Sequence, residues 1–180
     1  MSALYVPAEP RFAIHRSEYA LDPITGAPTK LTGDSGSAGE DGASFISVLV
    51  MAHSGADKSN KPGMVWVWAQ VTPGRRARTS AMTNLVLSMP PSSGLYTRAS
   101  SSQLMGSGAA DDPTVDIGRR LSSRFKRPIF VSLNNVSTSR LTASAVVAGP
   151  SLALSMVQAD ELVALESCLV AELRMALSSA

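Results

Sequence analysis

The chain has 180 residues, of which 44% are hydrophobic and 17% are charged, and its formal net charge is +2. This length predicts one domain over residues 1–180 with a substantial hydrophobic core. The single cysteine excludes an intrachain disulfide, and the N-terminus does not resemble a secretory signal. No apolar run approaches the length that a membrane span needs.

Charge is unevenly distributed along the chain. Residues 61–150 carry eleven Lys and Arg against three Asp, whereas residues 1–60 and 151–180 are acidic. Within the basic middle, five of the nine residues from Arg119 to Arg127 are cationic. Such an asymmetric field favours an acidic partner, or neutralisation by the acidic ends of the same chain.

Strands dominate the first half of the chain. A strand predicted over Phe12–Leu21 is followed by residues 22–43, whose Gly, Pro, Ser, Thr and Asp content predicts a flexible loop. Ser44–His53 and Met64–Val71 are rich in β-branched and aromatic residues and predict an antiparallel hairpin. Two shorter strands are expected next, at Asn84–Met89 and within Gly94–Leu104.

A helix is predicted over Thr114–Lys126, with Thr114 as its N-cap, Asp116 in its first turn and Pro128 at its end. Its apolar stripe is formed by Ile117, Leu121 and Phe125.

Ile129–Asn134 reads as a strand, and residues 136–158 form an insertion whose structure the sequence does not define. A final helix is expected from about Ser155 or Asp160 to Leu177. One side of it is lined by Leu162, Leu165, Leu169, Leu173 and Leu177. The acids of this helix are expected elsewhere on its surface, at Glu161, Glu166 and Glu172.

The predicted strands are apolar on both of their faces. In Met64–Val71, Trp66 and Trp68 share one face while valines and an alanine share the other. A half-solvated antiparallel sheet would instead alternate apolar and polar residues. The predicted fold is therefore α+β, a mainly antiparallel sheet of about six strands with two helices on one face. The other face is available for sheet-on-sheet dimerisation, unless the sheet curls on itself or a third helix lies within 141–158.

Residues that could carry catalysis or bind metal are sparse. His15 and His53 lie in predicted strands without the spacing of a metal site. Cys168 lies among leucines, and the sequence indicates no base that could activate its thiol as a nucleophile. Asp111 and Asp112 precede a helix start, where acids cap the backbone. We expect no catalytic residue, cofactor or metal.

A basic nucleic-acid-binding module is the rival interpretation. Arg75, Arg76 and Arg78 add a second cationic cluster to the one in the helix. Aromatic residues make up only 5% of the chain, however, and no known nucleic-acid-binding motif is present. Nucleic acid is therefore not the expected partner.

The segment TVDIGRRLSSRFKRPIFVSLNN resembles the signature region of the proteasome assembly chaperone 4 family, where a Leu-Ala-x-Arg-Leu-Ala helix leads through a basic turn to a Val-Phe-Val-Ser-Tyr-Asn strand. Matching positions are Ile117, Arg120, Leu121, Phe130, Val131, Ser132 and Asn134. Upstream, MVWVWAQV is similar to the family's Leu-Phe-Leu-Trp-Val-Gly strand, and NLVLSMP to its Asn-Leu-Ala-Val-Ala-Met strand, at Asn84, Leu85, Val86 and Met89. Gly118 departs from the motif's alanine and Leu133 from its tyrosine.

This resemblance implies a non-enzymatic chaperone subunit that promotes formation of the alpha ring of the 20S core particle. The implied partners are a subunit similar to proteasome assembly chaperone 3, packed sheet to sheet in a heterodimer, and proteasome alpha subunits of the alpha-5 type. A chaperone 3-like homodimer is the alternative. The expected location is cytoplasmic, with the nucleus as a second compartment. Candidate partner-binding residues are Trp66, Trp68, Arg119, Arg120 and Arg124.

Overall fold

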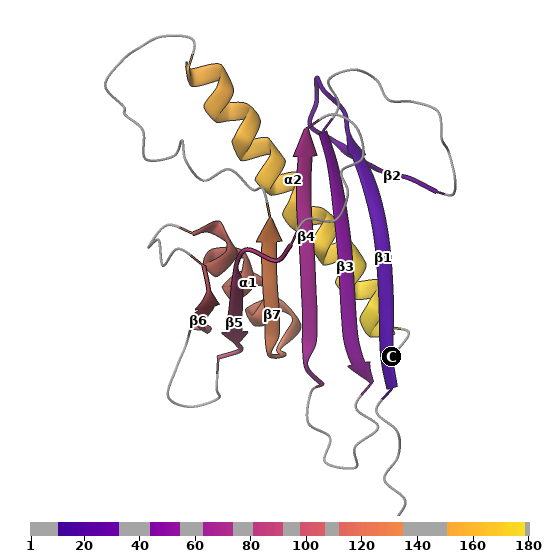
Figure 1. The fold of residues 1–180 in the computed structure, drawn as a ribbon, viewed down its shortest axis with the longest axis vertical. Coiled ribbons are helices and arrows are strands. Elements are labelled where there is room, and N and C mark those ends of the chain that lie inside the picture. The colour runs from indigo at the N-terminus through magenta and orange to yellow at the C-terminus, as the bar shows by residue number, and fades with distance from the viewer. Residues whose placement is uncertain are drawn as a thin grey trace, which may run out of the picture.

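The computed structural model describes residues 11–32, 44–54, 63–73, 81–91, 98–106, 112–134 and 151–178, and for 151–160 the backbone alone. Within these ranges the chain forms seven strands and two helices (Figure 1). In chain order they are β1 (Arg11–Leu21), β2 (Pro28–Lys30), β3 (Ser44–Ser54), β4 (Val65–Pro73), β5 (Leu85–Met89), β6 (Ser100–Met105), α1 (Pro113–Phe125), β7 (Ile129–Asn134) and α2 (Ser151–Ser178).

The seven strands form one open sheet in the order β2-β1-β3-β4-β7-β5-β6. All neighbouring pairs are antiparallel except β4 and β7, which run parallel. A parallel pair needs a long crossover connection, and here β5, β6 and α1 supply it. The predicted hairpin is confirmed as β3 and β4, with Val50 opposite Val67.

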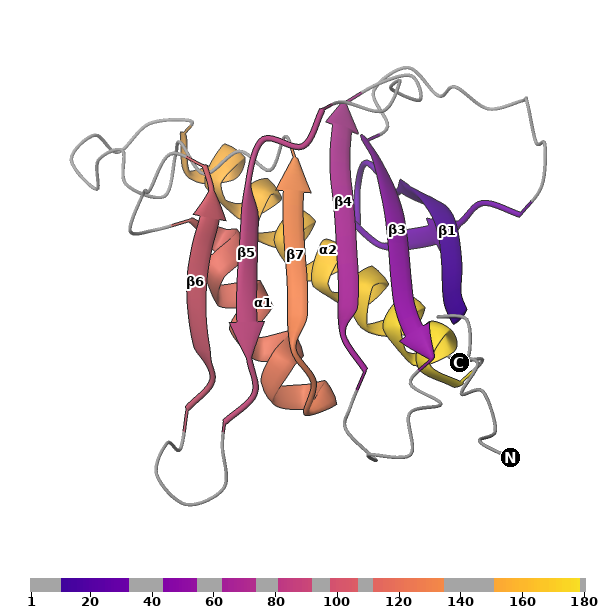
Figure 2. The same cartoon turned by 60° about the horizontal axis from the view of Figure 1, so that its bottom comes forward.

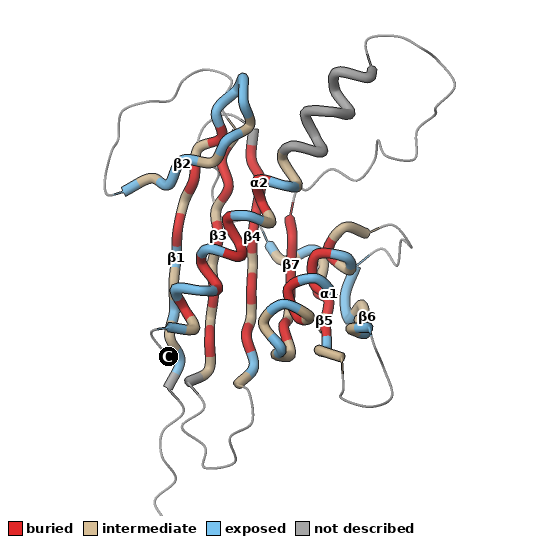
Figure 3. Tube along the Cα trace, turned by 180° about the vertical axis from the view of Figure 1, so that it is seen from behind, coloured by how far each residue is buried: buried red, intermediate tan, exposed pale blue. Residues whose placement is uncertain are grey.

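Both helices lie on the same face of the sheet (Figure 2). α1 packs on β5, β6 and β7, whereas α2 crosses β1, β2 and β3. Figure 3, which views the sheet from the helix side, shows buried residues alternating with more exposed ones along β3 and β4. The predicted α+β class is therefore confirmed, with a seventh strand beyond the expected six.

The core lies between the helices and this covered face. The helix-facing valines of β3 and β4, Val48, Val50, Val65 and Val67, are at most 1% exposed. Ile117 and Leu121 of the predicted stripe join them from α1, and Phe125 packs at the margin of the same cluster. From α2 the buried residues include Leu165, Leu169 and Leu173, with Leu162 and Leu177 partly buried beside them.

The start of α1 differs from the prediction in its capping residue. Asp112, and not Thr114, is the N-cap, and its side chain accepts a hydrogen bond from the Thr114 backbone N–H at 2.9 Å. Pro113 follows at the first helical position, where its missing N–H costs nothing. The helix ends at Phe125 because Lys126 adopts the left-handed conformation, with φ 54°.

Two elements differ from the sequence-based expectation. β2 falls within residues 22–43, which were expected to form a loop, and residues 33–43 lie outside the described part of the chain. α2 begins at Ser151, earlier than either predicted start, whereas β6 lies within the expected stretch except for its last residue, Met105. The C-terminal part of the 136–158 insertion therefore belongs to α2, and residues 135–150 lie outside the description.

Candidate protein-interaction surfaces

The face of the sheet that points away from the helices, which we call the open face, carries a continuous line of apolar side chains. Cross-strand partners connect it from β1 to β5. We call this line the apolar row, and it consists of Ile14, Met51, Trp66, Phe130 and Leu87. Directly opposed side chains on one sheet face lie about 5 Å apart, so each member lies beside the next. The row therefore forms one surface across five strands.

Aromatic contacts order the centre of the open face. The Trp66 and Phe130 rings stack with centroids 5.4 Å apart and an interplanar angle of 24°. Trp68 lies opposite Leu49 on the same face, and both tryptophans are half-buried. At the β1 end the face is more accessible, since Ile14 is 64% exposed.

Part of the open face is covered by the chain itself. Residues 81–84, which precede β5, lie over the end of β7 and are tied to it by hydrogen bonds. Asn84 Oδ1 accepts from the Leu133 backbone N–H at 2.9 Å and from Ser132 Oγ at 3.3 Å, while its amide donates to Thr114 Oγ1 at 2.8 Å. Asn84 thereby joins β5, β7 and the start of α1.

A second amide completes this cover. The side-chain oxygen of Asn134 accepts from the Thr83 hydroxyl at 2.9 Å, and its nitrogen donates to the Ala81 carbonyl at 2.7 Å. Asn134 and Ser132 are buried as a result, although they share a face with Phe130. The Asn and Ser positions of the motifs in the sequence thus hold a crossover segment against the sheet.

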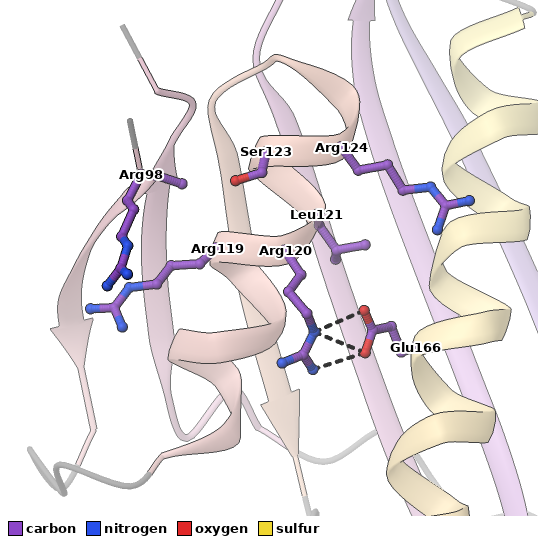
Figure 4. Close-up of a pocket in the computed structure, with 8 residues that line it drawn as sticks. Arg98, Arg119, Arg120, Leu121, Ser123, Arg124 and Glu166 are labelled. Atoms are coloured by element: carbon purple, nitrogen blue, oxygen red, sulfur yellow. Dashed lines mark hydrogen bonds and ion pairs between the residues drawn. The ribbon is translucent and has the colours of Figure 1, made fainter. Parts of the chain in front are cut away.

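A second surface lies on the helix side of the sheet, between β6, α1 and α2. A groove of about 890 Å³ there, which we call the cationic groove, is lined by Arg98, Ala99, Arg119, Arg120, Leu121, Ser123, Arg124 and Glu166 (Figure 4). Four of these eight residues are arginines. Figure 4 shows the Arg98 and Arg119 side chains extending towards one region and Arg124 extending towards α2.

The arginines of the groove differ in their local partners. Arg120 forms a bidentate pair with Glu166, with Nε–Oε1 at 2.9 Å and Nη2–Oε2 at 2.8 Å, and this pair joins α1 to α2. The Glu166 carboxylate raises the pKa of Arg120 above its ordinary value. Arg119 makes a looser contact, with Nη1 at 3.5 Å from Asp116 Oδ1, and both side chains are well exposed. Among the described residues, no carboxylate forms an ion pair with Arg98 or Arg124.

The structure thus divides the five candidate residues between two surfaces. Trp66 and Trp68 lie on the open face, whereas Arg119, Arg120 and Arg124 lie on the opposite side, around α1. Sequence reasoning did not identify Arg98, because it precedes a short polar strand and stands alone in the sequence. The alternative of neutralisation by the acidic ends of the chain is realised at Arg120, although the sequence did not identify its specific partner, Glu166, 46 residues away.

A buried charged group was also missed. Glu172 was expected away from the leucine-lined side of the final helix, with no sign of burial, yet it is 1% exposed and faces β1 and β2. The Tyr19 hydroxyl donates to its carboxylate, and Lys30 Nζ lies 2.7 Å from Oε1. Burial opposes ionisation of Glu172, but the hydrogen bonds from Lys30, Tyr19 and Ser17 outweigh it and hold the pKa below its ordinary value. The same burial and the neighbouring Glu172 raise the pKa of Tyr19.

Other candidate groups for chemistry remain apart. Among the described residues, no three of His, Cys, Asp and Glu come together as metal ligands. Cys168 is buried in α2, and burial followed by the Glu172 charge raises the pKa of its thiol to about 12. Neither helix in the described part of the chain is long and apolar enough to cross a membrane.

The chain was compared with curated proteins, solved structures and family models. No curated protein matches the chain. A chain from the crystal structure of a chaperone complex for yeast 20S proteasome assembly is similar, with 18% sequence identity and a TM-score of 0.43 over 73% of this chain and 88% of that one. A likeness of this degree carries no functional conclusion. The family model of proteasome assembly chaperone 4, a family of non-enzymatic chaperones, matches residues 48–134, from β3 to the end of β7. Over residues 48–134 the chain thus matches the proteasome assembly chaperone 4 family, the family that its motifs resemble.

Proposed function

We propose that this protein is one subunit of a dimeric proteasome assembly chaperone, which acts in the cytoplasm and the nucleus. Its open face packs against the sheet of a subunit similar to proteasome assembly chaperone 3. The dimer then binds alpha subunits, of the alpha-5 type, while the alpha ring of the 20S core particle forms. It works by transient surface complementarity and changes no covalent bond.

The apolar row is the observation that carries this proposal. A row of five large apolar side chains across five strands is more than scattered surface hydrophobicity, and patches of this kind mark protein interaction sites. A standard interface buries about 800 Å² on each partner. Burying about 700 Å² of apolar surface contributes roughly 18 kcal/mol gross. The loss of translational and rotational freedom opposes this with an estimated 4–15 kcal/mol, so a stable dimer remains feasible.

Two features disfavour nucleic acid as the main partner. The Trp66, Trp68 and Phe130 rings lie on the open face, whereas Arg119, Arg120 and Arg124 lie on the helix side, so these three arginines have no stacking platform beside them. Arg16 lies on the open face but is paired with Glu18, and Arg75, Arg76 and Arg78 lie outside the described residues. In the cationic groove, Arg120 is already paired with Glu166, and Asp116 lies beside Arg119. Protein contacts by Arg119 and Arg124 are sensitive to salt and act on the rate of encounter.

The test is affinity capture of the tagged chain from an extract of its own cells. We expect a chaperone 3-like subunit and alpha subunits to be recovered together. The Ile14→Asp variant places a charge in the apolar row and is expected to lose the chaperone subunit. Ile24→Asp is the matched control, because Ile24 is 92% exposed in the turn after β1 and outside the row.

The outcomes separate the alternatives. Recovery of neither a chaperone-like subunit nor alpha subunits would refute the proposed function. Equal losses in the Ile14 and Ile24 variants would show that the apolar row is not the interface. Measuring the mass of the purified chain in solution distinguishes a self-associating homodimer, in which Ile14→Asp produces monomers, from a subunit that needs a different partner.

A further inference from the structure

The cationic groove contains more positive charge than its own carboxylates can neutralise. Four arginines line it, whereas Glu166 is the one acid in the lining and Asp116 lies at its edge. The bidentate Arg120–Glu166 pair satisfies both of its members. Arg98, Arg119 and Arg124 are therefore the arginines whose guanidinium groups can meet a ligand.

These three arginines come from two separate elements. Arg98 precedes β6, while Arg119 and Arg124 stand more than one turn apart on α1. Arg98 and Arg119 reach the same part of the groove, and Arg124 lies nearer α2 (Figure 4). The exposed contact between Arg119 and Asp116 is of the kind that contributes little, so a better acceptor can replace it. The groove thus offers two cationic positions separated by the Arg120–Glu166 pair.

We infer that the cationic groove binds an acidic segment of a protein, one carboxylate pairing with Arg98 and Arg119 and another with Arg124. The planar guanidinium group matches a carboxylate in a two-point contact, which favours arginine at such sites. A continuous phosphate backbone fits less well, because the Glu166 and Asp116 carboxylates interrupt the positive surface. The lining residues also include no aromatic ring on which a base could stack.

The position of the groove gives this inference its functional meaning. The groove lies on the helix side of the sheet, whereas the apolar row lies on the open face. A sheet-packed partner therefore leaves the groove accessible, and both surfaces can be occupied at once. The inference rests on the proposed function only for the source of the acidic segment, which is the client subunit.

Binding can be measured with the purified full-length chain and a fluorescein-labelled peptide of alternating Glu and Ser, read by fluorescence anisotropy. The same peptide with Gln in place of Glu tests for charge. The Arg98→Glu/Arg124→Glu double variant places a carboxylate in each of the two cationic positions. Arg16→Glu/Arg174→Glu is the control pair, because it changes the net charge equally at exposed arginines outside the groove.

We expect the Glu peptide to bind and the Gln peptide to fail. The Arg98→Glu/Arg124→Glu variant should weaken peptide binding by at least about tenfold, as expected when two ion pairs are replaced by repulsion. The Arg16→Glu/Arg174→Glu control should weaken it by less than about twofold. Affinity should fall as salt rises from about 50 to 300 mM. The milder Arg98→Gln/Arg124→Gln variant should also weaken peptide binding, so the inference can still be tested if the Arg98→Glu/Arg124→Glu variant misfolds.

Equal losses in the groove and control pairs, or no binding of the Glu peptide, would overturn the inference. Tighter binding of a single-stranded RNA of the same length, dependent on the same arginines, would overturn it in favour of nucleic acid. The groove pair should still capture the chaperone 3-like subunit from extract. A chain that binds the peptide but captures no proteasomal protein would refute the proposed function and leave the groove assignment intact.

Discussion

Replacing Gly118 by alanine is expected to destabilise the protein, although alanine is the better helix former. Gly118 is buried where α1 meets β5. A Cβ atom at this position would overlap the Ser88 hydroxyl oxygen, while its other neighbours, Ser88 Cβ and Val131 Cγ2, would lie at 3.4 and 3.6 Å. The Ser88 hydroxyl is fully buried and lies 2.8 Å from Ser101 Oγ, with which it forms a hydrogen bond. Glycine therefore lets α1 pack closely against β5 without displacing the Ser88 hydroxyl from its hydrogen bond with Ser101.

The opposing contributions can be compared directly. Alanine in a helix interior gains up to about 1 kcal/mol over glycine. Overpacking a core costs about 1–3 kcal/mol, and turning the Ser88 hydroxyl away from Ser101 loses roughly a further 1 kcal/mol. Gly118→Ala should thus lower the free energy of unfolding by about 1–3 kcal/mol. In a Ser88→Ala background the obstructing oxygen is gone, and the contacts with the Cβ of residue 88 and with Val131 Cγ2 are ordinary van der Waals contacts. Gly118→Ala should then stabilise the protein by up to about 1 kcal/mol.

The assay is a double-mutant cycle by urea unfolding at one fixed protein concentration, followed by tryptophan fluorescence. The expected result is a change of sign for Gly118→Ala between the two backgrounds. The family motifs have alanine at the positions of both Ser88 and Gly118, so the Ser88→Ala/Gly118→Ala variant has the two alanines of those motifs. If Gly118→Ala stabilises the wild-type chain, or costs the same with and without the Ser88 hydroxyl, the steric reasoning is wrong.

Four further predictions concern the buried polar groups. Because the pKa of Glu172 is lowered on folding, its charge stabilises the protein above the ordinary glutamate pKa of 4.5, and this contribution is lost as the pH falls through the folded-state value. The midpoint of urea unfolding should therefore fall less steeply between pH 7 and pH 3 in the Glu172→Gln variant than in the wild-type chain. Lys30→Met should destabilise at pH 7 by about 1–3 kcal/mol in the same assay, because it leaves the buried carboxylate without its cation. Asn84→Ala should lower the free energy of unfolding by about 2–4 kcal/mol, because it leaves Thr114 and the Leu133 N–H without their partner. Cys168 should react with a thiol reagent only at the rate of unfolding, because it is buried with its pKa raised to about 12, and fast labelling of native protein would contradict this.

Periodicity along the sequence was sufficient to locate the main elements. β3, β4 and β7 are strongly apolar with β-branched residues, and α1 repeats apolar residues every four positions, so local pattern and tertiary packing agree. The short edge strand β2 was missed and the start of α2 was placed too late in the chain, because neither carries a comparable signal. Element boundaries depend on caps such as Asp112, whose competitor Thr114 is also a preferred capping residue.

The candidate site was harder to predict because its contacts join distant parts of the chain. Glu172 looked like a surface acid, and its burial depends on Tyr19 and Lys30, which lie 153 and 142 residues away. Likewise, the cationic stretch on α1 gave no sign that Arg120 pairs with Glu166. A buried carboxylate is tolerated only where the fold brings donors to it, and sequence spacing holds no information about such partners.

The position of the apolar row argues for face-to-face packing over addition of a strand at either edge. Trp66 lies on β4, three strands from the edge strand β6 and two strands from β1, which is itself an edge before Tyr19, where β2 does not pair with it. With neighbouring strands about 4.8 Å apart, its Cα is roughly 14 Å from the first of these strands and 10 Å from the second. A strand added beyond β1 or β6 would leave Trp66 and Phe130 exposed. Only a second layer over the open face can bury the row as a whole, which is what a sheet-packed partner would do.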